Sequence, residues 1–130
     1  MIAGPGIRKG QSDALVYLFD LFPTLCELTA VAVPNVCEGV SLAAALKGEA
    51  KPPRETLFAA YRDCQRMVRD ERWKLIDYPK VGRVQLFDLS KDADEMEDLS
   101  AKPEHNGRVA AMQAKLKEQQ KSWNDPLAKK

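Results

Sequence analysis

The feature that most constrains the fold is a run of short strand-like segments that precedes a single long helical segment. Turn-forming residues separate the strand-like segments, so neighbouring strands can pair antiparallel through short connections. We expect strands over residues 57–61, 65–69, 73–78 and 84–87, with a hairpin turn at residues 70–72. The sequence therefore predicts a small antiparallel sheet of three or four strands.

A helix expected over residues 103–123 can cover one face of that sheet. Val109, Met112, Leu116 and Trp123 recur along it at helical spacing, which predicts a single buried stripe. An antiparallel sheet must bury its apolar face against another element, and this helix is the longest available. The expected fold class is therefore α+β, with the small sheet packed against a long C-terminal helix.

Helical signals dominate the first fifty residues. Asp20 is an N-cap candidate for a helix over residues 20–30, whose leucines keep helical spacing. A second, short helix is expected over residues 42–47, closed by Gly48 in a left-handed conformation. Residues 1–3 are interpreted as the end of a strand. This region is therefore expected to form a helical arm.

The best internal boundary lies at residues 49–54, where Pro52 and Pro53 favour an extended linker. We therefore divide the chain into residues 1–50, the helical arm, and residues 51–130, the sheet and its helix.

Composition excludes several classes of protein. Hydrophobic residues make up 45 % of the 130 residues, enough for a core, and the formal net charge is only +1. So small a charge does not favour binding to nucleic acid or to a membrane surface. No run approaches the roughly 20 apolar residues of a membrane-spanning helix, and the first residues do not resemble a secretory signal.

Cysteine and histidine are too few and too scattered for a metal centre. The chain has three cysteines, Cys26, Cys37 and Cys64, and one histidine, without any C-x-x-C pair. Free, small apolar side chains are the favoured interpretation of the cysteines. A single Cys26–Cys37 disulfide remains open as the alternative.

A set of short motifs then appears in a fixed order. Residues 1–50 carry a Pro-Gly turn, a basic loop, a D-x-x-P-T-L helix, a loop proline and a G-x-S-L segment: Gly4-Pro-Gly6, Lys9-Gly10, Asp20–Leu25, Pro34 and Gly39-Val-Ser-Leu42. Residues 51–130 carry R-x-V-R, K-L-I, L-F-D-L and an acidic turn: Arg66-Met-Val-Arg69, Lys74-Leu-Ile76, Leu86-Phe-Asp-Leu89 and Asp92–Leu99. Each motif is weak alone, but their order and spacing together resemble the C-terminal region of a type I, formylglycine-dependent sulfatase or arylsulfatase.

Two residues depart from the family pattern. Ala93 stands where the family usually has proline, and Asp98 stands where it usually has asparagine. Both lie in the acidic turn, so they are expected to change the rigidity of that turn and not to weaken the family resemblance.

The resemblance has consequences for fold and chemistry. It implies that residues 1–50 are a remnant of the larger, alkaline-phosphatase-like α/β domain, and that residues 51–130 are the C-terminal subdomain. Sulfatases of this type use a divalent metal, usually calcium, and a formylglycine made from the first residue of a C/S-x-P/A-x-R sequence. None of the three cysteines begins such a sequence.

We therefore expect no catalytic and no metal-binding residue in this chain. Calcium and formylglycine are expected only in the full-length family enzyme. The predicted function is that of a C-terminal fragment of a sulfatase, a sulfuric ester hydrolase, inactive alone. The alternative is a stand-alone interaction module that binds a partner protein or a sulfated glycan.

A basic cluster is the remaining chemically suggestive group. Arginine suits sulfate because its planar fork can donate two hydrogen bonds to sulfate oxygens. Arg66 is the best candidate for a substrate-facing residue, followed by Arg62. The alternative is a solvated sheet face on which the cluster pairs with acidic neighbours, namely Asp63, Asp70, Glu71 and Asp77.

The helical arm is expected to lack its normal partner. Leu18, Phe19, Phe22 and Leu25 should form an exposed apolar patch that contacts the missing catalytic domain or a second copy of the chain. A sulfate ester substrate is expected only in the full-length context. Full-length relatives are often periplasmic or secreted, and the compartment of this chain stays open.

Overall fold

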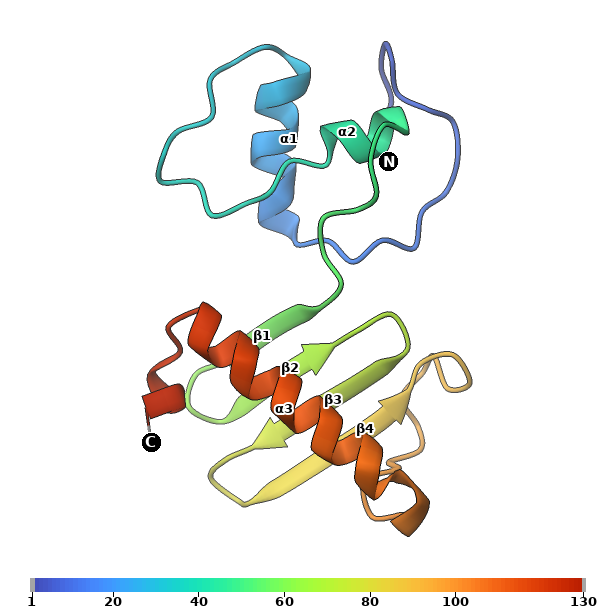
Figure 1. Ribbon diagram of the computed structural model, residues 1–130, viewed down its shortest axis with the longest axis vertical. Coiled ribbons are helices and arrows are strands. Elements are labelled where there is room, and N and C mark those ends of the chain that lie inside the picture. Colours follow the sequence, from blue (N-terminus) through green and yellow to red (C-terminus); the bar gives the residue numbers. More distant parts are fainter. Residues whose placement is uncertain (1, 130) are drawn as a thin grey trace. The chain divides into compact units, whose positions relative to one another are not determined.

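The computed structural model describes residues 2–129, which divide between Glu55 and Thr56 into two compact units (Figure 1). The first unit comprises residues 1–55 and the second comprises residues 56–130. The expected assignment of residues 1–50 to a larger α/β domain stays a prediction.

The second unit contains the predicted sheet, which has four antiparallel strands in the order β1-β2-β3-β4. The strands are β1 (Leu57–Tyr61), β2 (Gln65–Arg69), β3 (Trp73–Tyr78) and β4 (Arg83–Asp88). Each strand pairs with the next along the chain, as short connections require. The α+β prediction is confirmed, and β4 extends one residue beyond the expected strand at each end.

The turn between β2 and β3 shows why an aspartate opens this hairpin. The Asp70 carboxylate accepts hydrogen bonds from the backbone N–H groups of Arg72 and Trp73, at 3.1 and 2.7 Å. This is the local side-chain to backbone bonding that makes aspartate a good turn residue. Lys115 of the C-terminal helix also binds Asp70, so the turn is tied to the helix.

Helix α3 (Asn106–Ser122) lies across one face of the sheet, preceded by a 3-10 turn at Pro103–His105 (Figure 1). Met112 and Leu116 are buried, and Val109 packs beside them. The sheet contributes the rest of one continuous core, formed by Val68, Trp73, Leu75, Leu86 and Leu99. The predicted helix is confirmed, but Trp123 follows its last helical residue and is half-buried.

The acidic turn after β4 is held by its own carboxylates. Asp92 accepts hydrogen bonds from the N–H groups of Met96 and Glu97. Asp98 accepts from the N–H groups of Leu86 and Ser100, at 3.1 and 3.0 Å. A carboxylate oxygen therefore supplies at position 98 the acceptor that the side-chain oxygen of asparagine could also supply.

The first unit is built from a 3-10 turn (Leu18–Asp20), α1 (Leu21–Leu28) and α2 (Ala43–Lys47). Both helices are shorter than expected: α1 ends two residues before Ala30, and α2 begins after Leu42. Gly48 adopts the predicted left-handed conformation, with φ +80°. The expected strand end is absent at residues 2 and 3, and Met1 lies outside the described residues.

Asp20 does not act as the predicted N-cap, because its own backbone is already helical and its side chain bonds elsewhere. The carboxylate is fully buried and accepts hydrogen bonds from the N–H groups of Tyr17 and Val40. Arg54 completes the set, with Nε and Nη2 at 2.9 and 2.6 Å from the two carboxylate oxygens. Burial raises the pKa of Asp20, but the hydrogen bonds from Arg54 and the two amides outweigh it and leave the pKa lowered.

Gly39 of the G-x-S-L segment is required by a close approach within this unit. A Cβ atom at this position would lie 2.5 Å from the carbonyl oxygen of Phe19 and 3.0 Å from the ring of Pro23. Any larger residue would therefore push the loop away from the start of α1.

Candidate functional site

Arg66, the leading sequence candidate, lies on β2 with only 3 % of its surface exposed. Its Nε and Nη2 donate to the two carboxylate oxygens of Asp125 at 2.6 and 2.8 Å, and its Nη1 donates to the carbonyl oxygens of Arg62 and Gln65. The Arg66 hydrogen bonds lower the pKa of Asp125 to about 2. The structure thus places the whole guanidinium in a buried, charge-assisted pair that ties β2 to the segment after α3.

Arg62 lies in the turn between β1 and β2 and is exposed. Its backbone has a positive φ of 48°, and its guanidinium carbon lies 5.7 Å from the centre of the Tyr61 ring. The two candidates are joined through the Arg62 carbonyl oxygen rather than through a shared anion site. A contact between either arginine and a sulfate ester stays a prediction; for Arg66 it would require release from Asp125.

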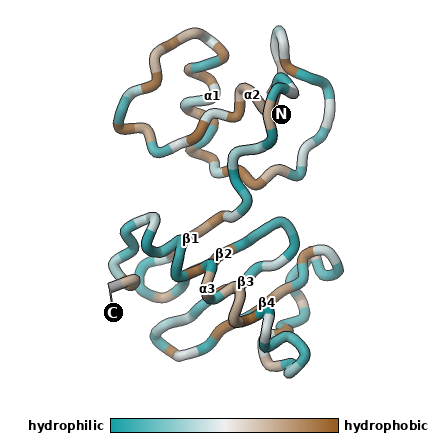
Figure 2. The backbone as a smooth tube through the Cα atoms, in the orientation of Figure 1, coloured by the Kyte–Doolittle hydropathy of each residue, from teal (hydrophilic) through white to brown (hydrophobic). Residues whose placement is uncertain are grey.

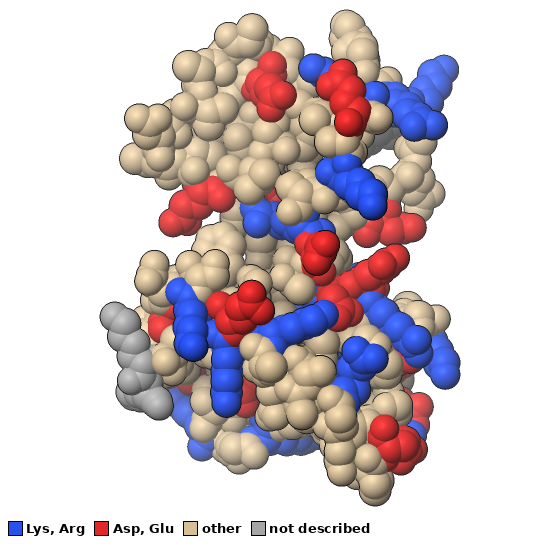
Figure 3. Space-filling model, viewed as in Figure 1, with Lys and Arg blue, Asp and Glu red and all other residues tan. Residues whose placement is uncertain are grey.

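The basic cluster also contains Arg69, Arg72 and Lys74. Arg72 and Lys74 are paired, but with partners other than those expected, whereas the buried Nε of Arg69 has no hydrogen-bond partner among the described residues. Arg72 binds Asp88 with two hydrogen bonds of 2.9 and 2.6 Å, and Lys74 binds Glu95. Of the acidic residues that the sequence suggested, Asp63 pairs with Lys80 and Asp70 pairs with Lys115. On the face of the second unit that Figure 3 shows, Lys and Arg side chains lie beside Asp and Glu side chains.

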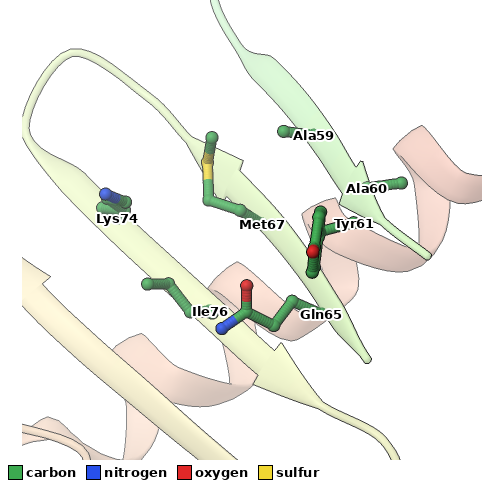
Figure 4. Close-up of a pocket in the computed structure, with 7 residues that line it drawn as sticks. All are labelled: Ala59, Ala60, Tyr61, Gln65, Met67, Lys74 and Ile76. Atoms are coloured by element: carbon green, nitrogen blue, oxygen red, sulfur yellow. The ribbon is translucent and has the colours of Figure 1, made fainter. Parts of the chain in front are cut away.

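A shallow hollow of about 230 Å³ lies on the sheet face turned away from α3 (Figure 4). Gln65, Met67, Lys74 and Ile76 project into view from β2 and β3, and Tyr61 adds its ring from the end of β1. Its full lining is Ala59, Ala60, Tyr61, Gln65, Met67, Lys74 and Ile76. The lining offers no carboxylate, imidazole or thiol. Its two titratable side chains are Tyr61 and Lys74, and Lys74 is already paired with Glu95.

A second hollow, of about 200 Å³, lies beside the acidic turn. Asp88, Lys102 and His105 line it together with Lys91, Asp92, Glu97 and Leu99. Several of its charges are paired, because Asp88 binds Arg72 and Lys102 binds Glu97. The His105 ring lies 5.7 Å from the Trp73 ring, where it packs against the end of the core.

The described side chains do not fit a family calcium centre. Within residues 2–129, no three His, Cys, Asp or Glu side chains converge as metal ligands would have to. All three cysteines are free, with Cys26 buried and Cys37 and Cys64 half-buried, so the open alternative of a Cys26–Cys37 disulfide is wrong for this structure. In the same span, no helix has the length and apolar character needed to cross a membrane.

Sequence reasoning missed two carboxylates that organise the structure. The sequence pattern presents Asp20 only as a helix cap and does not single out Asp125. The available signal at Asp20 was its place between Leu18-Phe19 and Leu21-Phe22, because a carboxylate inside an apolar run must be buried with a partner. Nothing local identified Arg54 or Arg66 as those partners.

Comparison with known proteins agrees with the motif order. A family model described as "N-sulphoglucosamine sulphohydrolase, C-terminal" matches residues 2–122. The delta 4,5-hexuronate-2-O-sulfatase of Bacteroides thetaiotaomicron is 32 % identical over 129 residues, covering 89 % of this chain and 27 % of that protein. Arylsulfatase K of Gallus gallus is 35 % identical over 117 residues, covering 78 % of this chain and 22 % of that protein.

Comparison of the fold with solved structures also points to sulfatases. A solved 2-O GAG sulfatase superposes with a TM-score of 0.81 and 32 % identity, covering 98 % of this chain and 30 % of that one. The chain thus spans about a quarter of the length of the curated relatives it matches.

Proposed function

Because the chain belongs to the sulfatase family, through the C-terminal region of that family, we propose that it is the C-terminal part of a sulfuric ester hydrolase. The observation that carries the proposal is the extent of the match. The family model matches residues 2–122 of this chain, whereas the alignment with the bacterial hexuronate sulfatase covers 89 % of this chain but only 27 % of that protein. The remaining part of such an enzyme would have to supply the reactive centre.

The chain then has a structural role in the enzyme and does not supply the catalytic residues. Its sheet and α3 form one continuous core, and two bidentate ion pairs, Arg66–Asp125 and Arg72–Asp88, hold segments of the unit together. Neither pair leaves a nucleophile beside a general base. Calcium and a formylglycine nucleophile would come from the rest of the enzyme, since none of the three cysteines begins a C-x-P-x-R sequence and the described part of the chain holds no converging ligand set.

Arg62 is the residue of this chain that is best available to a sulfated substrate. It is exposed and stands at the end of the sheet beside the exposed Tyr61. Among residues 2–129, no carboxylate forms an ion pair with its guanidinium. Arg66 would act through it, because the Arg66 Nη1 donates to the Arg62 carbonyl oxygen at 2.7 Å and so fixes the turn. Arg66 is therefore a positioning residue in this proposal.

The test is a sulfatase assay on the purified chain, with 4-nitrophenyl sulfate as substrate and calcium present or absent. We expect no release of 4-nitrophenol above the buffer blank under either condition. Turnover by the isolated chain would show that the reactive centre lies within it and would overturn the proposal. Salt-sensitive retention on immobilised heparin that is lost in Arg62→Ala would instead favour the alternative role of a module that binds a sulfated glycan.

A further inference from the structure

After α3 the chain turns back toward the loop between β1 and β2 (Figure 1). Asn124, with a positive φ of 50°, lies at this reversal, and a 3-10 turn over Pro126–Lys129 follows it. We call residues 124–129 the C-terminal strap. The match to the family model ends at residue 122, so the strap lies beyond the part of the chain that this model describes.

One buried side chain fastens the strap to the sheet. Among the described side chains of the strap only Asp125 is buried, whereas Leu127 and Ala128 are half-buried. Figure 2 shows hydrophilic colouring from the last turns of α3 into the strap, so little apolar burial reinforces this anchor. Among the described residues, the hydrogen bonds from the sheet to the strap all come from Arg66. A segment held at one such point opens locally at low cost.

Asp77 offers Arg66 a second carboxylate. Arg66 of β2 and Asp77 of β3 lie directly opposite each other in the sheet. Both are on the side that faces α3, because Arg66 lies two residues before Val68 and Asp77 two residues after Leu75, and both of these belong to the core. Side chains so placed have Cβ atoms about 5 Å apart, close enough for an arginine and a carboxylate to pair.

The Asp77 carboxylate is not committed to another cation. Among residues 2–129, no Lys, Arg or His side chain forms an ion pair with it. Burial raises the pKa of Asp77 above its ordinary value, although the nearby charge of Arg66 acts to lower it. Asp77 therefore has more to gain from an ion pair with Arg66 than it obtains while Asp125 holds that guanidinium.

The Arg66 guanidinium also fixes the turn that carries Arg62. Its Nη1 donates to the carbonyl oxygens of Arg62 and Gln65, at 2.7 and 2.8 Å. The Arg62 backbone has a positive φ of 48°, which is uncommon for a residue with a side chain and persists where surrounding contacts hold it. Because Asp125 orients the guanidinium that holds Arg62, a displacement of the strap also loosens this turn.

We propose that the C-terminal strap is a latch with two positions, in which Arg66 exchanges Asp125 for Asp77. In the closed position, which the structure shows, Arg66 binds Asp125 and holds the Arg62 turn. In the open position the strap leaves β2 and Arg66 turns to Asp77, so the guanidinium is not left without a counter-charge. The strap thus controls the order of the residue that is best available to a sulfated substrate, and this last step rests on the proposed function.

NMR relaxation of the full chain tests the latch. Asp125→Asn weakens the closed position, and Asp77→Asn removes the partner of the open one. The matched control is Lys115→Met, which breaks another ion pair between α3 and the sheet hairpin, because Lys115 binds Asp70. Circular dichroism of each variant checks that its fold is retained.

Two backbone amides report on the two ends of the latch. The Ala128 N–H donates to the Asp125 carbonyl oxygen in the strap, and the Cys64 N–H donates to the Tyr61 carbonyl oxygen across the Arg62 turn. In Asp125→Asn we expect the order parameters of both amides to fall below about 0.6, while core amides stay near about 0.85. Asp77→Asn and Lys115→Met should leave both amides as in the unaltered chain. A rigid Cys64 amide in Asp125→Asn would overturn the link between strap and turn.

The exchange of partners has its own readout. In Asp125→Asn the pKa of Asp77, followed by NMR titration of its carboxyl carbon, should fall below its value in the unaltered chain, because Arg66 now pairs with it. Asp77→Asn should also lower the urea midpoint more in the Asp125→Asn background than in the unaltered chain. An unchanged Asp77 pKa, or equal effects in the two backgrounds, would overturn the exchange.

A milder variant repeats the test with less risk to folding. The Gln120 side chain donates to Asp125 Oδ2 at 2.8 Å, so Gln120→Leu should lower the Ala128 order parameter in the same direction. None of these measurements uses a sulfate ester. Turnover by the isolated chain would therefore contradict the proposed function and leave the latch as measured, whereas a rigid turn in Asp125→Asn would contradict the latch alone.

Discussion

Replacing Asp125 by asparagine removes one charge from the Arg66–Asp125 pair while keeping the side chain's size. In the native chain, Arg66 Nε and Nη2 lie 2.6 and 2.8 Å from the carboxylate, and the two side chains are 3 % and 2 % exposed. The variant leaves a buried guanidinium without its counter-charge, and breaking a buried pair in this way costs about 3–5 kcal/mol. Because Arg66 keeps two carbonyl acceptors, we expect the lower end, about 3 kcal/mol.

Urea unfolding followed by tryptophan fluorescence measures this loss. Both tryptophans, Trp73 and Trp123, belong to the second unit, so the signal reports the unit that contains the pair. With a denaturant slope of about 2 kcal/mol/M, a loss of 3 kcal/mol lowers the midpoint by about 1.5 M. The matched control is Lys80→Met, which breaks an exposed pair with Asp63 at 2.7 Å and should cost less than about 1 kcal/mol.

The dependence on pH provides a second measurement of the same pair. Arg66 lowers the pKa of Asp125 to about 2 in the folded chain, against about 3.9 in an unfolded one. The stabilisation is therefore fully present above about pH 4 and is lost as the pH falls through 2. It amounts to about 2.5 kcal/mol, because each pKa unit corresponds to about 1.4 kcal/mol, and Asp125→Asn should not show this part of the acid loss.

Two results would refute this reasoning. One is a loss of stability in Asp125→Asn no larger than that in Lys80→Met. The other is a double variant, Arg66→Met/Asp125→Leu, that is less stable than Asp125→Asn, because removing both charges should leave no uncompensated buried ion.

Two further predictions concern hydrogen bonds that a side-chain oxygen accepts from backbone N–H groups. Thr24→Val should leave the buried Leu42 N–H without its acceptor and lower the free energy of unfolding by about 1–3 kcal/mol. Hydrogen exchange should show that this amide loses its protection, and Thr24→Ser should restore the protection. Asp98→Ala should lower the free energy of unfolding in urea by about 1 kcal/mol, because the Leu86 and Ser100 N–H groups lose their acceptor. Asp98→Asn should change this free energy by less than about 0.5 kcal/mol. Equal losses in the two variants would contradict the assignment.

The fold was predictable because its signals are local. The strands end at turn residues such as Asp70, whose carboxylate bonds the next two N–H groups of its own turn. The stripe of Val109, Met112 and Leu116 follows from helical periodicity alone. These patterns, and the order of the motifs, were enough to reach the antiparallel sheet, the covering helix and the family.

The boundaries in the first unit were less predictable because tertiary contacts override local preference there. Asp20 has the chemistry of an N-cap, yet its side chain turns toward Arg54, which lies 34 residues further along the chain. The 3-10 turn and α1 therefore run on through the position where a helix start was expected.

The sequence by itself determined which segments of the second unit become strands and helix, which side chains of α3 face the main core, and to which family the chain belongs. Only the tertiary structure decided the partners of the charges: Arg66 meets Asp125 across 59 residues, and Arg72 meets Asp88 rather than a nearer acid. Periodicity and turn chemistry act over a few residues and can be read locally. Which buried charges meet depends on how the strands pack against α3. That packing brings together residues that are far apart in the sequence, and the residues around one of them carry no information about the other.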